Sequence, residues 1–206
     1  MYHKKTVVLI VGISLILGAC VNLRQPSNKV EYYVLEYDPP LFTDMDQLPY
    51  AVSVEYLAVA PIYDTTQIIY RERSFTREAY AYHRWRVNPG EMITSLLNRD
   101  IRLSGLFKTV TSHDSQYGAR FSLGGEVEEF YEWDTEGGWK AVLSLSISLI
   151  SVNERDVDKR VFYQKSYRAT ETCKQKNPRA LAEALSLEMS RLSREIISDV
   201  YEHLSN

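Results

Sequence analysis

Two long runs of alternating side chains constrain the fold of this chain more than any other feature. In the second run, Lys140–Val152, leucine or isoleucine occupies every other position from Leu143 to Leu149, with serines between them. A period of two is typical of a strand that buries one face. The sequence DTEGG separates this run from the first one, Phe121–Trp133, and its glycines can adopt the positive φ of a hairpin loop. The sequence therefore predicts a long β-hairpin.

Two helices are predicted from matching start signals. In Asn88–Pro89 and again in Asn177–Pro178, an N-cap side chain precedes a proline suited to the first helical position. Apolar residues recur at helical spacing after both pairs, as far as Gly105 in the first helix and about Leu204 in the second. Glu188 is the one polar residue in the apolar stripe of the second helix.

Shorter strands are expected around these elements, and Gly124–Gly125 predicts a bulge in the first long strand. The shorter segments are residues 31–37, 51–59, 67–73, 79–85, 107–110 and 159–169. The fold class that follows is α+β, a single domain with a largely antiparallel β-sheet packed on one face by two amphipathic helices.

The amino terminus has the pattern of a lipoprotein signal peptide. Lys4 and Lys5 precede the apolar run Val7–Ala19, which is shorter than the roughly 20 residues needed to span a bilayer. Leu17–Cys20 then reads as a lipobox, in which the Cys20 thiol receives the lipid. The alternative is an unmodified signal peptide or a short membrane anchor in which the cysteine is accidental.

The lipobox predicts both the domain organisation and the location of the chain. Residues 1–19 form the signal peptide, residues 20–30 a lipidated tether with Pro26 and Ser27, and residues 31–206 the folded domain. Lipoproteins with Asp after the lipidated cysteine stay at the inner membrane. Val21 occupies that position here, so we expect an outer-membrane lipoprotein that faces the periplasm.

Composition excludes several classes of function. Two of the 24 Lys and Arg residues lie in the signal peptide, so 22 basic side chains remain against 27 acidic ones, and nothing favours nucleic-acid binding. Cys173 is the one cysteine after Cys20, and it is expected to be buried and inert rather than paired between chains. Nine of the 15 tyrosines fall between Tyr32 and Tyr82, which favours strands and a surface that contacts a partner.

No arrangement of residues predicts catalysis. Ser112, His113 and Asp114 are consecutive, so they cannot align as nucleophile, base and orienting acid. Glu126 and Glu128 share a strand face, but a charged solvent-facing edge accounts for them. Histidine and cysteine residues have no metal-ligand spacing. We therefore expect no enzyme, no metal and no cofactor other than the lipid on Cys20.

Several short motifs together resemble the ABC-type transport auxiliary lipoproteins, the PqiC-like family. Their order along the chain is a YYxL strand, a YDxxQIxYR segment, HRW before a helix, LF after it, and LxGxVxxF in a strand. The matching residues are Tyr32, Tyr33 and Leu35; Tyr63, Asp64, Gln67, Ile68, Tyr70 and Arg71; His83, Arg84 and Trp85; Leu106 and Phe107; and Leu123, Gly125, Val127 and Phe130. The Tyr-rich sequence AYAYHRW departs from the family pattern.

This resemblance implies a non-catalytic outer-membrane lipoprotein that works with an MCE-domain protein and inner-membrane transport components. Such systems move phospholipid or other hydrophobic cargo across the periplasm, and a homo-oligomeric ring is a further implication. Two other functions stay open, namely a plug or assembly factor for an outer-membrane barrel and a periplasmic hydrolase.

The resemblance also implies a contact surface for a partner or for lipid. Arg71 and Arg84 can bind phosphate or carboxylate, and Trp85 can anchor an interface. The alternative for Gln67, Arg71 and Trp85 is a structural role between strands and helix. The full candidate set is Tyr63, Asp64, Gln67, Arg71, Tyr82, His83, Arg84 and Trp85.

Overall fold

The computed structural model describes residues 29–112, 114–115 and 118–205. Along the chain the elements are β1 (Glu31–Tyr33), β2 (Leu48–Val54), β3 (Ala58–Val59), β4 (Gln67–Arg71), β5 (Glu78–Trp85), α2 (Pro89–Leu103), β6 (Phe107–Ser112), β7 (Phe121–Thr135), β8 (Gly138–Ser151), α3 (Val157–Arg160), β9 (Val161–Thr172) and α4 (Pro178–Ser205). Within this part of the chain, no helix is both long and apolar enough to cross a membrane. The predicted α+β fold is confirmed.

Strand β7 is the centre of the sheet. One edge of β7 pairs with β8 along its whole length in antiparallel register, and β8 pairs in the same way with β9. The other edge pairs with three short parallel strands in succession, first β2, then β3 and finally β4. The sheet continues through β5 and β1 beyond β4, and through β6 beyond β2. Most paired residues are antiparallel, as predicted.

Two of the predicted strands are shorter than expected because their backbones bond to helices instead. The first strand ends at Tyr33, and the Glu36 amide donates to Ser186 Oγ of α4 at 3.0 Å. The predicted strand 51–59 is split into β2 and β3. The break lies at Leu57, which is fully buried and whose amide donates to Thr94 Oγ1 of α2 at 2.9 Å.

The predicted bulge at Gly124–Gly125 is wrong. Both glycines stay in register with β8, and the shift in register lies between Val127 and Glu129. A Cβ atom at Gly125 would lie 1.9 Å from the carbonyl oxygen of Ser146, and its φ is 157°. Glycine is needed there because the two backbones approach closely, not because the strand is interrupted.

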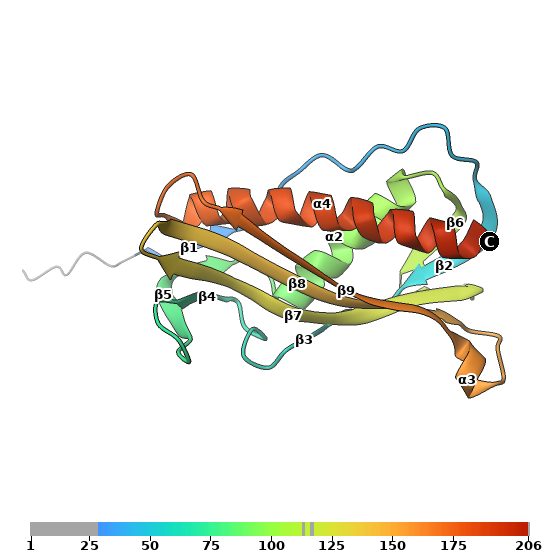
Figure 1. Cartoon of the computed structure of the whole chain (residues 1–206), viewed down its shortest axis with the longest axis horizontal. Coiled ribbons are helices and arrows are strands. Elements are labelled where there is room, and N and C mark those ends of the chain that lie inside the picture. Colours follow the sequence, from blue (N-terminus) through green and yellow to red (C-terminus); the bar gives the residue numbers. More distant parts are fainter. Residues whose placement is uncertain (1–28, 113, 116–117, 206) are drawn as a thin grey trace, which may run out of the picture.

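Helices α2 and α4 lie on the same face of the sheet (Figure 1). Both begin as predicted, since Asn88 Oδ1 accepts from the Gly90 amide and Asn177 Oδ1 accepts from the Ala180 amide, each at 2.9 Å. The alternating leucines and isoleucines of β8 are fully buried beneath them. The opposite face of the sheet, which we call the open face, carries neither long helix.

Glu188 occupies a core position of α4. Its side chain is 1% exposed, and within the described residues neither carboxylate oxygen has a hydrogen-bond partner. The pKa of Glu188 is raised to about 8, chiefly by burial; Arg191 and Arg168 oppose this rise, and Glu171 adds to it. The predicted polar break in the apolar stripe is therefore a buried, unpaired carboxyl group.

The beginning of the described chain and three turns lie at one end of the sheet. Strand β1 starts there beside β5, and the β4–β5, β7–β8 and β9–α4 turns lie at the same end (Figure 1). We call it the hairpin end. The C-terminal end of α4, the start of β7 and α3 lie at the other end, the far end.

Candidate partner-contact surface

A row of cationic and aromatic side chains crosses the open face near the hairpin end. Arg71, Trp133 and Lys140 lie directly opposite one another on β4, β7 and β8. The apolar odd-numbered residues of β8 face the helices, so the even-numbered Lys140 faces away from them. The guanidinium carbon of Arg71 lies 4.8 Å from the centre of the Trp133 ring, and Lys140 Nζ lies 5.7 Å from it. Both contacts are cation–π interactions.

A second cation–aromatic contact lies two residues earlier along β7. The Tyr63 ring stacks on Tyr131 with centroids 5.8 Å apart and an interplanar angle of 8°. The guanidinium carbon of Arg77 lies 4.4 Å from the centre of the Tyr131 ring, and Arg77 Nε donates to the Tyr63 hydroxyl at 3.2 Å. The loop between β3 and β4 thus covers Tyr131.

The cations of this surface differ in how they are neutralised. Arg168 donates to Glu129 at 2.6 Å and forms an ion pair. Within the described part of the chain, no ion pair joins Arg71, Arg77 or Lys140 to a carboxylate, and Arg71 Nε has no hydrogen-bond partner. These three cations are available for an anionic group such as a phosphate or a partner's carboxylate. We refer to Arg71, Arg77, Tyr131, Trp133 and Lys140 as the cation–aromatic surface.

Two of the predicted contact residues lie in the core. Trp85 is 1% exposed and packs on Phe130, with ring centroids 5.0 Å apart. Tyr63 is also buried, stacked on Tyr131 and bonded through its hydroxyl to Arg77. Burial supports the structural alternative for Trp85.

Asp64 and Gln67 connect neighbouring elements. Asp64 Oδ1 accepts from Asn88 Nδ2 at 2.7 Å, which links the β3–β4 loop to the cap of α2. Gln67 Nε2 donates to the carbonyl oxygen of Tyr80 at 3.2 Å, between β4 and β5. Both contacts position the segment that carries the cation–aromatic surface.

The other predicted residues keep accessible surface. Tyr82 is exposed, and Arg71, His83 and Arg84 are half-buried. The His83 ring lies 5.6 Å from the ring of Tyr80 between centroids, and Arg84 Nε has no partner within the described residues. Asp64 is exposed and Gln67 is half-buried as well, so six of the eight predicted residues keep surface that can meet another molecule.

Sequence reasoning missed the rest of the cation–aromatic surface. Tyr131 and Trp133 alternate on the predicted strand, so a shared face could have been expected from the period of two. Lys140 follows from the hairpin register that the DTEGG turn sets. Arg77 carried no comparable signal, because its place depends on the non-local stacking of Tyr63.

On the helix side of the same strands, Glu132 is 1% exposed. The Tyr80 hydroxyl donates to its two carboxylate oxygens at 3.1 and 3.0 Å. Burial raises the pKa of Glu132 to about 8, an effect that the bond from Tyr80 opposes. Burial also raises the pKa of the nearby Cys173 thiol to about 12, and Cys173 is buried and free, as predicted.

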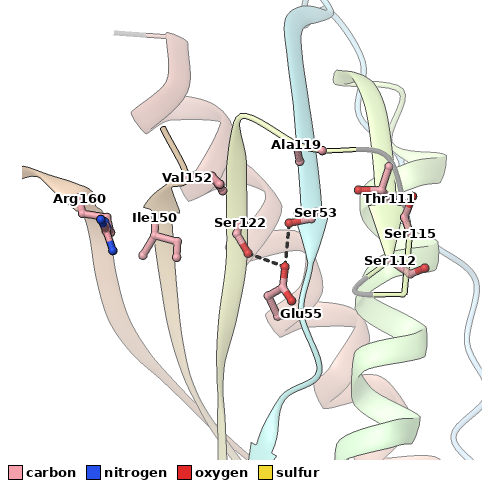
Figure 2. A pocket seen from close by; sticks show the side chains of 11 residues that line it. Ser53, Glu55, Thr111, Ser112, Ser115, Ala119, Ser122, Ile150, Val152 and Arg160 are labelled. Atoms are coloured by element: carbon pink, nitrogen blue, oxygen red, sulfur yellow. Dashed lines mark hydrogen bonds between the residues drawn. The ribbon is translucent and has the colours of Figure 1, made fainter. Parts of the chain in front are cut away.

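The far end of the sheet contains a polar hollow of about 360 Å³ (Figure 2). Ser53 Oγ and Ser122 Oγ donate to Glu55 at 2.9 and 2.7 Å, and Arg160 lies among the lining residues. The described lining residues include no histidine to take a proton from serine, as a serine hydrolase requires.

Two further site predictions concern catalysis and metals. Ser112 lines the hollow, whereas His113 lies outside the described residues. Cys20 also lies outside them. Across the part of the chain that the structure describes, no group of three or more His, Cys, Asp or Glu side chains could hold a metal ion.

The overall fold is shared with several solved structures. Protein XCC0632 from Xanthomonas campestris is 16% identical, with a TM-score of 0.76 over 84% of this chain and 96% of that one. An uncharacterized protein is 15% identical, with a TM-score of 0.63 over 84% and 99%. The hypothetical protein CT253 from Chlamydia trachomatis is 12% identical, with a TM-score of 0.51 over 77% and 100%. At these identities the similarity defines a fold class only. No curated protein matches the chain.

The sequence assigns the chain to a narrower class of protein than the fold does. The family of the ABC-type transport auxiliary lipoprotein component matches residues 33–197, and the chain belongs to this family. It is therefore an auxiliary lipoprotein component of an ABC-type transport system. The matched range extends from the end of β1 into α4 and includes the whole cation–aromatic surface.

Proposed function

We propose that this protein is a non-catalytic outer-membrane lipoprotein that docks an MCE-type transport system. Such a system moves phospholipid or other hydrophobic cargo across the periplasm. The observation that carries the proposal is the family match over residues 33–197, combined with the lipobox Leu17–Cys20.

The lipid on Cys20 and the tether hold the domain at the membrane. One acyl chain binds only marginally, whereas two or more anchor a protein stably. Val21 favours the outer membrane over the inner one. The partners are then an MCE-domain protein and inner-membrane transport components, and the domain is the docking point for the end of their conduit. Assembly into a homo-oligomeric ring is part of the proposal, and native mass spectrometry measures it.

The cation–aromatic surface is suited to such docking. Guanidinium groups form two parallel hydrogen bonds with a carboxylate, and aromatic side chains often provide most of the energy of an interface. Arg71 and Arg77 each lie beside an aromatic ring and lack a carboxylate partner within the described residues. The exposed Tyr82 and the half-buried Arg84 extend this surface along β5, whereas His83 lies on the other face of the strand, beside Tyr80.

Co-purification with the MCE protein from crosslinked membranes tests the proposal. We expect Arg71→Ala and Tyr82→Ala to fold normally and to lose most of the co-purified partner. Matched controls are Arg102→Ala, at an exposed position of α2, and Tyr56→Ala, at a position as exposed as Tyr82 with 47% of its surface accessible. Both controls should retain the partner.

Three results would contradict the proposal. If both test variants still co-purify with the MCE protein, the surface is not the docking site. If the crosslinked partner is an outer-membrane barrel, the protein is a plug or assembly factor. Hydrolysis of periplasmic esters that is lost in Ser122→Ala would support the hydrolase alternative.

A further inference from the structure

Phe75 lies in the β4–β5 turn with its side chain fully in solvent, at 103% relative exposure. Its φ is 68°, a left-handed conformation that is rare for a bulky residue. The turn is closed by the backbone amide and the hydroxyl of Thr76, which both donate to the carbonyl oxygen of Arg73, at 3.5 and 3.1 Å. A left-handed backbone at a bulky residue points to a function, and here it presents an aromatic ring to water.

The strand register places this turn at the end of the sheet where β1 begins. Strand β1 runs parallel to β5, with Glu31 opposite His83, so the first residue of β1 lies toward the Glu78 end of β5. Glu78 pairs with Tyr70 at the last step before the turn. The described chain therefore begins at the end of the sheet that carries the turn.

Distances along the chain bring the turn within reach of the anchoring membrane. Residues 21–30 span at most about 35 Å when fully extended. The stretch of β5 from His83 back to Glu78 covers only about 17 Å. A lipid on Cys20 thus allows the turn to touch the bilayer that holds it.

The side chains of the turn are suited to the headgroup region of a bilayer. Aromatic rings are enriched at this interface, and exposed cations bind lipid phosphates. Arg73 is exposed beside Phe75, and Lys29 is exposed where the described chain begins. Glu72 is the exposed acidic residue of the turn, so apolar insertion rather than net charge drives the contact.

We propose that the β4–β5 turn contacts the phospholipid bilayer, with Phe75 inserted among the headgroups and Arg73 on lipid phosphate. This contact rests on the proposed lipid anchor at Cys20. Two attachments, the lipid and the turn, fix the orientation of the domain. The hairpin end then faces the membrane, and the far end points away from it.

Site-specific fluorescence in the intact lipoprotein tests this contact. Phe75→Cys carries an environment-sensitive dye, and Phe162→Cys at the far end, where Phe162 packs near Phe121, is the matched control. Cys173 is 7% exposed and its high pKa keeps it unreactive toward the label. Each protein is reconstituted into vesicles of phosphatidylethanolamine and phosphatidylglycerol that contain a nitroxide lipid. Intact mass confirms the acyl chains beforehand.

We expect the dye at position 75 to shift its emission to shorter wavelength, to be quenched by the nitroxide lipid and to lose quenching by aqueous iodide. The dye at position 162 should behave in the opposite way. A dye at position 75 that resists both quenchers is covered by protein, and one still quenched by iodide is in water. Either result overturns the contact, as does equal lipid quenching at both positions. A mass without acyl chains refutes the anchor itself.

Discussion

Replacing Glu188 with leucine should stabilise the protein and remove part of its pH dependence. The carboxyl group is 1% exposed, lacks a hydrogen-bond partner within the described residues, and occupies the stripe that also contains Leu185 and Leu192. Leucine has a similar volume and suits this apolar site. The substitution therefore removes a buried polar group without opening a cavity.

The magnitude follows from the pKa of Glu188, which rises from its ordinary 4.5 to about 8. In the folded state the group keeps its proton to a higher pH than in the unfolded state, so the free energy of unfolding falls as the pH rises from 4.5 to 8. Each pH unit in this window removes up to about 1.4 kcal/mol. The whole window would remove up to about 5 kcal/mol, and relaxation of the folded site around the ionised carboxylate reduces this to about 3 kcal/mol.

Thermal unfolding of wild type and Glu188→Leu between pH 5 and pH 9 measures this effect. For a domain of this size, about 3 kcal/mol corresponds to a melting temperature about 6 to 12 °C higher for the variant at pH 9. Glu195→Gln, at an exposed position of the same helix, should leave both the stability and its pH dependence unchanged. The reasoning is refuted if Glu188→Leu is less stable than wild type at pH 9, or if its pH dependence equals that of wild type. Some dependence remains in the variant because Glu132 has a similarly raised pKa.

Three further substitutions test other parts of the account. Cys20→Ser should abolish incorporation of labelled palmitate, and retained label would place the lipid elsewhere. Gly125→Ala should lower the free energy of unfolding in urea by more than about 3 kcal/mol, because the new Cβ would lie 1.9 Å from the carbonyl oxygen of Ser146; a change below 1 kcal/mol would contradict the close approach. Phe75→Gly should raise the melting temperature by relieving about 1 kcal/mol of backbone strain while weakening membrane contact, and an unchanged or lower melting temperature would show that the turn is not strained.

The parts of the fold that local chemistry determines were predictable from the sequence. Asn88–Pro89 and Asn177–Pro178 each satisfy the first free amides of a helix within a few residues, so both helix starts were predicted correctly. The turn between β7 and β8 is local for the same reason, and Gly138 closes it with a φ of 128°.

Pairings between distant residues were not predictable. The three parallel strands along β7 depend on contacts between segments that are far apart in sequence, and no local pattern encodes them. The predicted position of the bulge was wrong for a related reason. Gly125 signals a close approach to Ser146, which has the same sequence signature as a bulge.

The residues of the cation–aromatic surface also differ in whether the local sequence predicts them. Arg71 was expected on the strength of a family motif, and its position follows from strand β4. Its neighbours Trp133 and Lys140 come from two other strands, and only the register of the sheet unites them. Trp85 shows the reverse error, since this motif residue was expected at an interface but packs on Phe130 in the core.

The central position of β7 also sets the order in which this protein can fold. Strands β2, β3 and β4 leave the ribosome, and would leave any translocation channel, before the strand they pair with. Strand β3 and one edge each of β2 and β4 have no sheet partner until Phe121–Thr135 has emerged, although β2 also pairs with β6 and β4 with β5. Closing the long loops to β7 is slow. The amino-terminal half should therefore stay unfolded until late in synthesis, and the domain should fold in one cooperative step once β7 and β8 have formed their hairpin.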